Sequence, residues 1–147
     1  LDSNLTSYVL YIIGEGSLKN NLIEKYKGKN IKFLGYLPNK EVLDFISKAK
    51  AVVTATKLYE GQPRLLCEAS SLGTLSIYPS FGGMDEFFPK KYEFSFEQFN
   101  YKNLTKKFDL LENNIKYNEA TLSISSYIID KLNEEAIQSQ FEHIVDS

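Results

Sequence analysis

Short apolar runs alternate with longer stretches of helical periodicity along most of the chain. The runs are rich in β-branched and aromatic residues and end near glycine or proline, which favours strands. Near-continuous apolar strands separated by helices are typical of a parallel sheet that helices cover on both faces. We therefore expect an α/β fold with a Rossmann-like parallel sheet. The predicted strands cover residues 8–13, 31–34, 51–55 and 75–78, the last ended by Pro79.

The stretches between these runs have recognisable helix ends. Ser17 is expected to cap the first helix, which Gly28 ends. Asn39 is expected to start the second, and Pro63 suits the first turn of the third. Beyond Phe94 the pattern predicts a helical C-terminal part. Its helices are expected at residues 104–113, around 122–129 and at 133–145.

The pattern predicts one α/β domain over residues 1–147, without repeats or linkers. The chain leads straight into a strand, whereas a doubly wound domain has an earlier strand and helix. We therefore expect this sequence to be a piece of a longer protein. Hydrophobic residues make up 43% of the chain and charged residues 24%, which excludes wholesale disorder.

Charge and cysteine content narrow the partners and the setting. The 17 basic and 19 acidic residues give a net charge of -2, so no basic field favours nucleic acid as a partner. Cys67 is the one cysteine, and no Cys/His cluster has metal-ligand spacing, so we expect a reducing, cytoplasmic setting. Nothing resembles a signal peptide. The longest apolar run, residues 8–13, is too short to span a bilayer, so any membrane association would be peripheral.

The segment from Lys57 to Ala69 reads as the end of a strand, a loop and a helix start. In open α/β sheets, ligands bind beyond the carboxyl ends of the strands, and a helix N-terminus presents backbone N–H groups to phosphate. Arg64, the one arginine, falls in the first helical turn, where the macrodipole disfavours a cation by roughly 0.3–1 kcal/mol. A bound anion would reverse that effect. The alternative is a surface pair with Glu68, which contributes only about 0.2–0.5 kcal/mol.

Two carboxylates and a pair of glycines surround this helix start. Glu60 falls in the loop and Glu68 inside the helix, so both carboxylates can face one ligand, or both can be solvated. Gly82 and Gly83 follow the fourth run and permit positive φ and close backbone approach, although they also suit an ordinary turn. Asp85 and Glu86 follow shortly after these glycines and fall at the start of a predicted short helix. Gly14, in Gly-Glu-Gly, lacks the third glycine of a dinucleotide fingerprint.

Two further residues are interpreted as structural. His143, the one histidine, lies in a predicted C-terminal helix beside Phe141 and Ile144, and a packing or surface role is expected. Cys67 lies among leucines and alanine and is expected to be a small buried apolar residue.

Taken together, five segments resemble the C-terminal domain of a GT-B glycosyltransferase of the group 1 (family four) class. They occur in the family's order and at similar spacing between Tyr8 and Pro89. The resemblance implies the C-terminal half of a GT-B fold and retaining transfer of a sugar from a nucleotide diphosphate donor, without metal or other cofactor. The matching segments are Ile-Ile-Gly-Glu-Gly at 12–16, Phe-Leu-Gly at 33–35, Glu-Gly-Gln-Pro-Arg-Leu-Leu-Cys-Glu-Ala at 60–69, Gly73 and Gly-Gly-Met-Asp-Glu at 82–86.

The resemblance also implies a role for each matched position. Glu60 would be catalytic, beside the transferred sugar, and Glu68 would bind the donor ribose. Backbone N–H groups at Arg64 and Leu65 would hold the diphosphate. The backbone of Tyr36 and Leu37 would meet the nucleobase, and the donor site would include the glycines Gly14, Gly61, Gly82 and Gly83. No Asp-x-Asp motif occurs, which agrees with a site that needs no metal.

The chain departs from the family pattern in two respects, and each bears on the expected function. Gln62-Pro63 stands where many members carry Phe-Gly, which we interpret as a mark of capsule and surface-polysaccharide enzymes. The Gly-Arg and Lys that grip donor phosphates in the family would precede the first strand, and the acceptor-binding N-terminal domain is expected to lie in a longer parent protein. We therefore expect a glycan or lipid-linked acceptor to bind through that domain, and the chain alone not to transfer sugar. The full enzyme is expected in the cytoplasm, with possible peripheral association at the inner face of the membrane.

Two other functions remain open at this point. One is a non-catalytic sugar-nucleotide binder on the same fold. The other is an α/β interaction domain of the receiver type, which would carry an acidic cluster at the strand ends, whereas the first strand ends in Gly14-Glu15.

Overall fold

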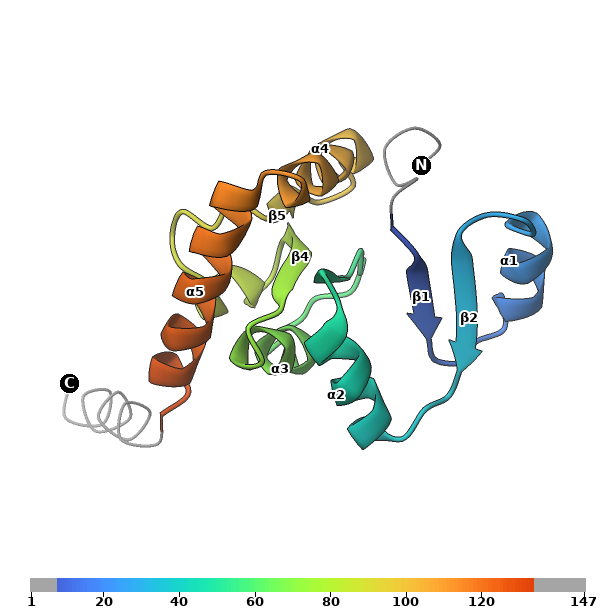
Figure 1. Ribbon diagram of the computed structural model, residues 1–147, viewed down its shortest axis with the longest axis horizontal. Coiled ribbons are helices and arrows are strands. Elements are labelled where there is room, and N and C mark those ends of the chain that lie inside the picture. Colours follow the sequence, from blue (N-terminus) through green and yellow to red (C-terminus); the bar gives the residue numbers. More distant parts are fainter. Residues whose placement is uncertain (1–7, 134–147) are drawn as a thin grey trace. The chain divides into compact units, whose positions relative to one another are not determined.

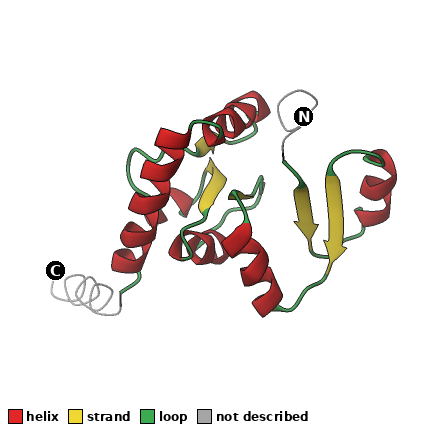
Figure 2. Cartoon of the chain, viewed as in Figure 1, coloured by secondary structure: helices red, strands yellow, loops and turns green. Residues whose placement is uncertain are grey.

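The computed structural model describes residues 8–133, which form parallel strands and helices in alternation (Figure 1; Figure 2). The fold is α/β, with parallel sheets flanked by helices, as predicted. The chain divides into two compact units that meet in sequence between Phe45 and Ile46, and each is described by itself.

The first unit contains two parallel strands and the helix between them. Strand β1 (Leu10–Ile13) pairs with β2 (Ile31–Gly35), and α1 (Lys19–Lys25) connects them. Asn39 begins α2 (Asn39–Lys48), as predicted, and the division between the units falls within this helix. Ser17 does not cap α1, which corrects the prediction. The N-cap is Leu18 because the Lys19 N–H already donates to the Gly16 carbonyl (3.1 Å), which places Ser17 inside a turn.

The second unit contains a three-stranded parallel sheet in the order β3-β4-β5. Every residue of the central strand except its last is buried, so β4 forms the middle of the core. The helices α3 and α5 contact each other, and α5 directs Ile124 and Ile128 into the core. The elements are β3 (Ala51–Val53), α3 (Arg64–Ser71), β4 (Leu75–Ser80), the 3-10 helix η1 (Met84–Phe87), β5 (Ser95–Glu97), α4 (Tyr101–Leu111) and α5 (Asn114–Lys131).

Strand β4 continues through Pro79 to Ser80, where the sequence predicts its end. Ile77 directs its carbonyl towards β3 and accepts the Thr54 N–H there (2.9 Å). Pro79 faces the same side two residues later, and β3 has already ended at Val53. Its missing N–H therefore removes no ladder hydrogen bond, which is the situation in which strands tolerate proline.

Strand β5 corrects the prediction that everything beyond Phe94 is helical. It is three residues long and pairs only with the end of β4, from Tyr78 to Ser80. At Ser76, two residues before Tyr78 in β4, the Tyr92 side chain takes the place of a neighbouring strand. Its hydroxyl donates to the Ser76 carbonyl (2.9 Å) and accepts from the Ser76 N–H (3.1 Å).

The C-terminal helices begin at asparagine caps. Asn100 accepts the Asn103 N–H at the start of α4 (3.0 Å), and Asn113 accepts the Lys116 N–H at the start of α5 (3.2 Å). Both helices are longer at their N-termini than predicted. The helix expected at 133–145, including His143, lies outside the described residues. None of the helices within residues 8–133 has the length and apolar character needed to cross a membrane.

Candidate functional site

The loop at Glu60–Gly61 and the turn at Gly82–Gly83 contact each other backbone to backbone. The Gly83 N–H donates to the Glu60 carbonyl (2.9 Å). A Cβ atom on Gly83 would lie 2.7 Å from the Gly61 carbonyl oxygen, and one on Gly82 would lie 2.9 Å from the Glu60 backbone carbonyl oxygen. Gly82 also has a φ of +67°. Both features expected of this glycine pair, a positive φ and close backbone approach, are therefore present.

Tyr59 and Phe81 extend the same contact through their side chains. Their rings meet edge to face, with centroids 6.0 Å apart, and both rings remain exposed. Such a pair adds an apolar contact to the polar one. The two loops follow the carboxyl ends of β3 and β4, which are neighbouring parallel strands. This is the edge at which the sequence predicts a ligand.

Helix α3 begins directly after Pro63, whose backbone angles (φ -80°, ψ 79°) are those of an inverse γ-turn. The turn closes through the Arg64 N–H, which donates to the Gln62 carbonyl (3.0 Å). The Pro63 carbonyl in turn accepts the N–H groups of Leu66 and Cys67. Within residues 8–133, no acceptor engages the Leu65 N–H. Of the two amides predicted for the diphosphate, one is thus used by the chain and one is open.

The guanidinium of Arg64 pairs with Glu68 along α3, with Nε 2.8 Å from Oε1. The Arg64 side chain is 81% exposed and the Glu68 side chain 26%. The surface pair considered in the sequence therefore forms. It uses one of the five guanidinium N–H donors and leaves the others facing solvent.

Glu60 is half-buried. In the described part of the chain its carboxylate has no hydrogen bond or ion pair. Its backbone is held by Gly83, and its side chain remains available to a ligand.

The residues Gly14, Tyr36 and Leu37 belong to the first unit. The Gly14 N–H donates to the Gly35 carbonyl (2.7 Å), and Tyr36 is 77% exposed. Beside them, Glu15 and Lys19 form an ion pair of 2.7 Å. The hydrogen bond from Lys19 holds the pKa of Glu15 below its usual value, with smaller contributions from the Lys19 charge and the Tyr36 backbone.

Asp85 is bound by two side chains of β4, which sequence reasoning did not identify. The Tyr78 hydroxyl donates to Oδ1 (3.0 Å), and the Ser80 hydroxyl donates to Oδ2. Burial, followed by the negative charge of Asp85, raises the pKa of Tyr78, so that its hydroxyl remains a donor. The signal in the sequence was the spacing of two between Tyr78 and Ser80, which places both on one face of a strand.

Cys67 is buried, as predicted, and burial raises the pKa of its thiol to about 11. No group of three or more His, Cys, Asp or Glu residues able to hold a metal ion occurs among residues 8–133.

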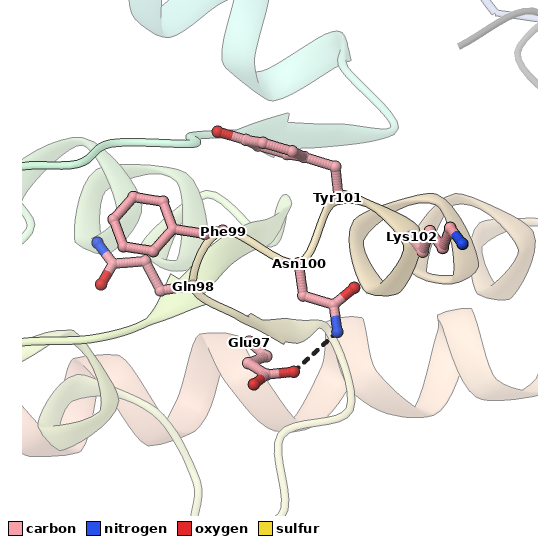
Figure 3. A pocket seen from close by; sticks show the side chains of 6 residues that line it. All are labelled: Glu97, Gln98, Phe99, Asn100, Tyr101 and Lys102. Atoms are coloured by element: carbon pink, nitrogen blue, oxygen red, sulfur yellow. Dashed lines mark hydrogen bonds between the residues drawn. The ribbon is translucent and has the colours of Figure 1, made fainter.

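The described residues of the second unit form hollows at the following two places. One is a shallow hollow at the end of β5 and the start of α4, where Asn100 donates to Glu97 (2.8 Å) (Figure 3). The other, of about 440 Å³, is beside Asp85 and is lined by Tyr78, Ser80, Asp85, Pro89, Lys90, Tyr92 and Ser95. Only the second adjoins the site described above, and it does so through η1.

Solved structures share this fold. A mutant of TarM from S. aureus, in complex with Fondaparinux, alpha-GlcNAc-glycerol and UDP, is 23% identical with a TM-score of 0.74 over 95% of this chain. Anabaena HepE in complex with UDP and glucose is 13% identical with a TM-score of 0.73 over 94% of the chain. The catalytic domain of the Helicobacter pylori cholesterol-alpha-glucosyltransferase is 19% identical with a TM-score of 0.67 over 82%. The chain spans 29% of TarM, 40% of HepE and 78% of the H. pylori domain.

These likenesses show an α/β fold that matches the domains of GT-B glycosyltransferases. No curated protein matches the sequence of the chain. A family model does: the model for glycosyl transferases group 1 matches residues 1–123. Since that match covers most of the 147 residues, the chain belongs to the glycosyl transferases group 1 family.

Proposed function

We propose that this chain is the donor-binding domain of a retaining, metal-independent glycosyltransferase that acts in cell-surface polysaccharide biosynthesis. One observation carries the proposal. The backbone contact between Glu60–Gly61 and Gly82–Gly83 holds the backbone of Glu60 at the carboxyl edge of two parallel strands, and the Glu60 carboxylate has no partner within residues 8–133. The same edge is where open α/β sheets bind ligands.

The proposed roles follow the chemistry of each group. Glu60 lies beside the transferred sugar, and Glu68 accepts hydrogen bonds from the ribose hydroxyls. The open Leu65 N–H and the start of α3 face the diphosphate, and Arg64 offers its remaining N–H donors to the same charge. With no metal, the helix end and the guanidinium would stabilise the leaving diphosphate.

Residues of the first unit are further proposed donor contacts, on the resemblance to the family. The backbone of Tyr36 and Leu37 would receive the nucleobase, and Gly14 would allow the sugar nucleotide to approach the end of β1 closely. Gly14 has a φ of +127°, and a Cβ there would meet nothing within 4 Å. The positive φ thus explains why a glycine occupies position 14, and no neighbouring atom limits the space beside it.

The proposal for the whole enzyme also includes its acceptor and its location in the cell. The chain spans 29% of TarM and 40% of HepE, and we propose that a separate N-terminal domain binds a glycan or lipid-linked acceptor. The complex of TarM with Fondaparinux and alpha-GlcNAc-glycerol supports a glycan acceptor. On this proposal the chain alone binds donor without transferring sugar, and the enzyme works in the cytoplasm or at the inner face of the membrane.

Ligand-observed NMR of the chain against UDP, GDP, ADP and CMP tests the donor site. We expect binding of a nucleoside diphosphate in the millimolar range, with UDP favoured by the HepE and TarM complexes. Glu68→Ala should weaken it by about tenfold, because losing hydrogen bonds to a charged group costs roughly 1.5 kcal/mol. Arg64→Ala should weaken it by about threefold, since the guanidinium is solvent-exposed.

The controls remove one charge of the same sign at exposed positions of other helices. Glu119→Ala on α5 and Lys106→Ala on α4 change the charge equally and should leave affinity unchanged. If no nucleotide binds the unmodified chain at millimolar concentration, the proposed donor site is wrong. If Arg64→Ala binds as well as the unmodified chain, the guanidinium has no phosphate role.

A further inference from the structure

The turn that contacts Glu60 has no side chain of its own to hold it. Gly82 and Gly83 can adopt many backbone conformations, and their conformational freedom opposes any single one. Yet Gly83 is buried and its N–H is bonded to the Glu60 carbonyl (2.9 Å). The geometry of the turn therefore depends on this hydrogen bond and on the residues that flank the turn.

Both flanks meet at one carboxylate. Ser80 precedes the turn and Asp85 follows it, and the Ser80 hydroxyl donates to Asp85 Oδ2. The Tyr78 hydroxyl donates to the other oxygen of the same carboxylate (3.0 Å). Asp85 thus ties η1 back to the strand that leads into the turn, and closes the chain from Ser80 to Asp85 into a small ring.

Tyr78, which binds Asp85 from strand β4, is held rigidly in the core. Tyr78 is 1% exposed, and its ring lies 4.4 Å from that of Phe88 and 5.9 Å from that of Tyr92. A fully buried ring packed against two others cannot change rotamer without disturbing the core. Asp85 itself is exposed, so its carboxylate reaches the buried Tyr78 hydroxyl from the surface of the second unit.

We propose that Asp85, held by Tyr78 and Ser80, is a positioning residue that fixes the Gly82–Gly83 turn against Glu60. This inference rests on the proposed donor site: a fixed turn keeps the Glu60 carboxylate at the sugar end of the donor. Without the Asp85 contacts, the turn loses its fixed geometry and the Gly83–Glu60 hydrogen bond opens more often.

Amide hydrogen exchange at Gly83 tests the first step without any ligand. Asp85→Ala should speed exchange of the Gly83 N–H by about tenfold, since local opening becomes easier by that factor. Tyr78→Phe should show a smaller increase, and Asp85→Asn should recover part of the protection because its amide oxygen still accepts one bond. The amide of Ile77, in the middle of β4, should be unchanged in Asp85→Ala.

Tyr92→Phe is the matched control for the loss of a buried tyrosine hydroxyl. Tyr92 belongs to the same aromatic cluster but bonds to Ser76 and not to Asp85. It should lower thermal stability and leave the exchange ratio of Gly83 to Ile77 unchanged. If Asp85→Ala leaves Gly83 exchange unchanged, or if Tyr92→Phe accelerates it equally, Asp85 does not position the turn.

Titration with UDP and with UDP-glucose tests the second step. Asp85→Ala should weaken UDP-glucose by about tenfold and UDP by less than about twofold, because Glu60 is proposed to meet the sugar and not the nucleotide. Equal weakening of both would mean that Asp85 supports the fold only, and overturns the positioning role. If the unmodified chain binds neither, the proposed donor site fails, and the exchange result alone decides whether Asp85 holds the turn.

Discussion

Single glycines decide what the loop contact between Glu60–Gly61 and Gly82–Gly83 can accept. A Cβ atom on Gly83 would lie 2.7 Å from a backbone oxygen, which cannot move away as a flexible side chain would. A Cβ on Gly61 would meet nothing within 4 Å. Position 83 therefore has no room for a side chain, whereas position 61 has room, although the two glycines face each other across one contact.

This difference gives a prediction about stability. Gly83→Ala should lower the free energy of unfolding by about 1–3 kcal/mol, because the backbone must shift to admit the methyl group. Gly61→Ala should change it by less than about 0.5 kcal/mol. Urea denaturation of both variants measures the difference. Equal values for the two variants would contradict the contact.

Much of the candidate site can be predicted residue by residue, and the exceptions have identifiable causes. The glycine pair, Cys67 and the Arg64–Glu68 pair follow from residue type and spacing. The bond from the Arg64 N–H to Gln62 does not, because the proline ring fixes φ of Pro63 but leaves ψ open. The contacts of Asp85 depend on β4 reaching Ser80, which Pro79 obscures in the sequence.

At the scale of elements, the caps set where the C-terminal helices begin. The apolar pattern predicts a helix only around residues 122–129, whereas α5 starts at Asn114. Its first two turns mix scattered apolar residues with polar ones, so the apolar pattern shows no clear helical period there. The Asn113 side chain supplies the missing start signal by accepting the Lys116 N–H (3.2 Å).

Removing this cap should shorten or loosen the first turn of α5. Asn113→Ala should cost about 1 kcal/mol of stability, the usual effect of losing an N-cap. Asn118→Ala, an exposed change within the same helix, should be neutral or slightly stabilising because alanine is the better helix former. Thermal melts followed by circular dichroism compare them. A larger loss for Asn118→Ala would refute the cap.

Strands show the same contrast between pattern and pairing. The apolar runs correctly indicate β1, β2, β3 and β4, because short runs of β-branched and aromatic residues favour strands. Strand β5 is missed, since three residues are too few for any period to show. Its existence depends on the neighbouring end of β4.

For the molecule as a whole, the sequence predicts the fold class and the family, and both are confirmed. It predicts one sheet, while residues 8–133 contain separate parallel pairings in two units. Periodicity identifies strands without specifying which strands are neighbours, so this level of organisation is not readable from the pattern. The single domain over residues 1–147 stays a prediction.

The two units should also differ in local stability. In residues 8–45 only Gly35 is buried, whereas the second unit contains the buried residues of β4, α3 and α5. Few buried contacts mean easier local opening. We expect amides of β1 and β2 to exchange at least about tenfold faster than those of β4 in native-state hydrogen exchange. Equal protection in both units would contradict this expectation.

The hydroxyl of Tyr92 has a consequence for solubility. A strand edge with unpaired N–H and C=O groups is a template on which another chain can add a strand and begin to aggregate. At Ser76, the edge of β4 not yet covered by β5 is closed by one phenolic oxygen that satisfies both backbone groups. The Tyr92 side chain thus leaves no unpaired backbone group at Ser76 to which another chain could add a strand. Strand β5 can therefore remain only three residues long.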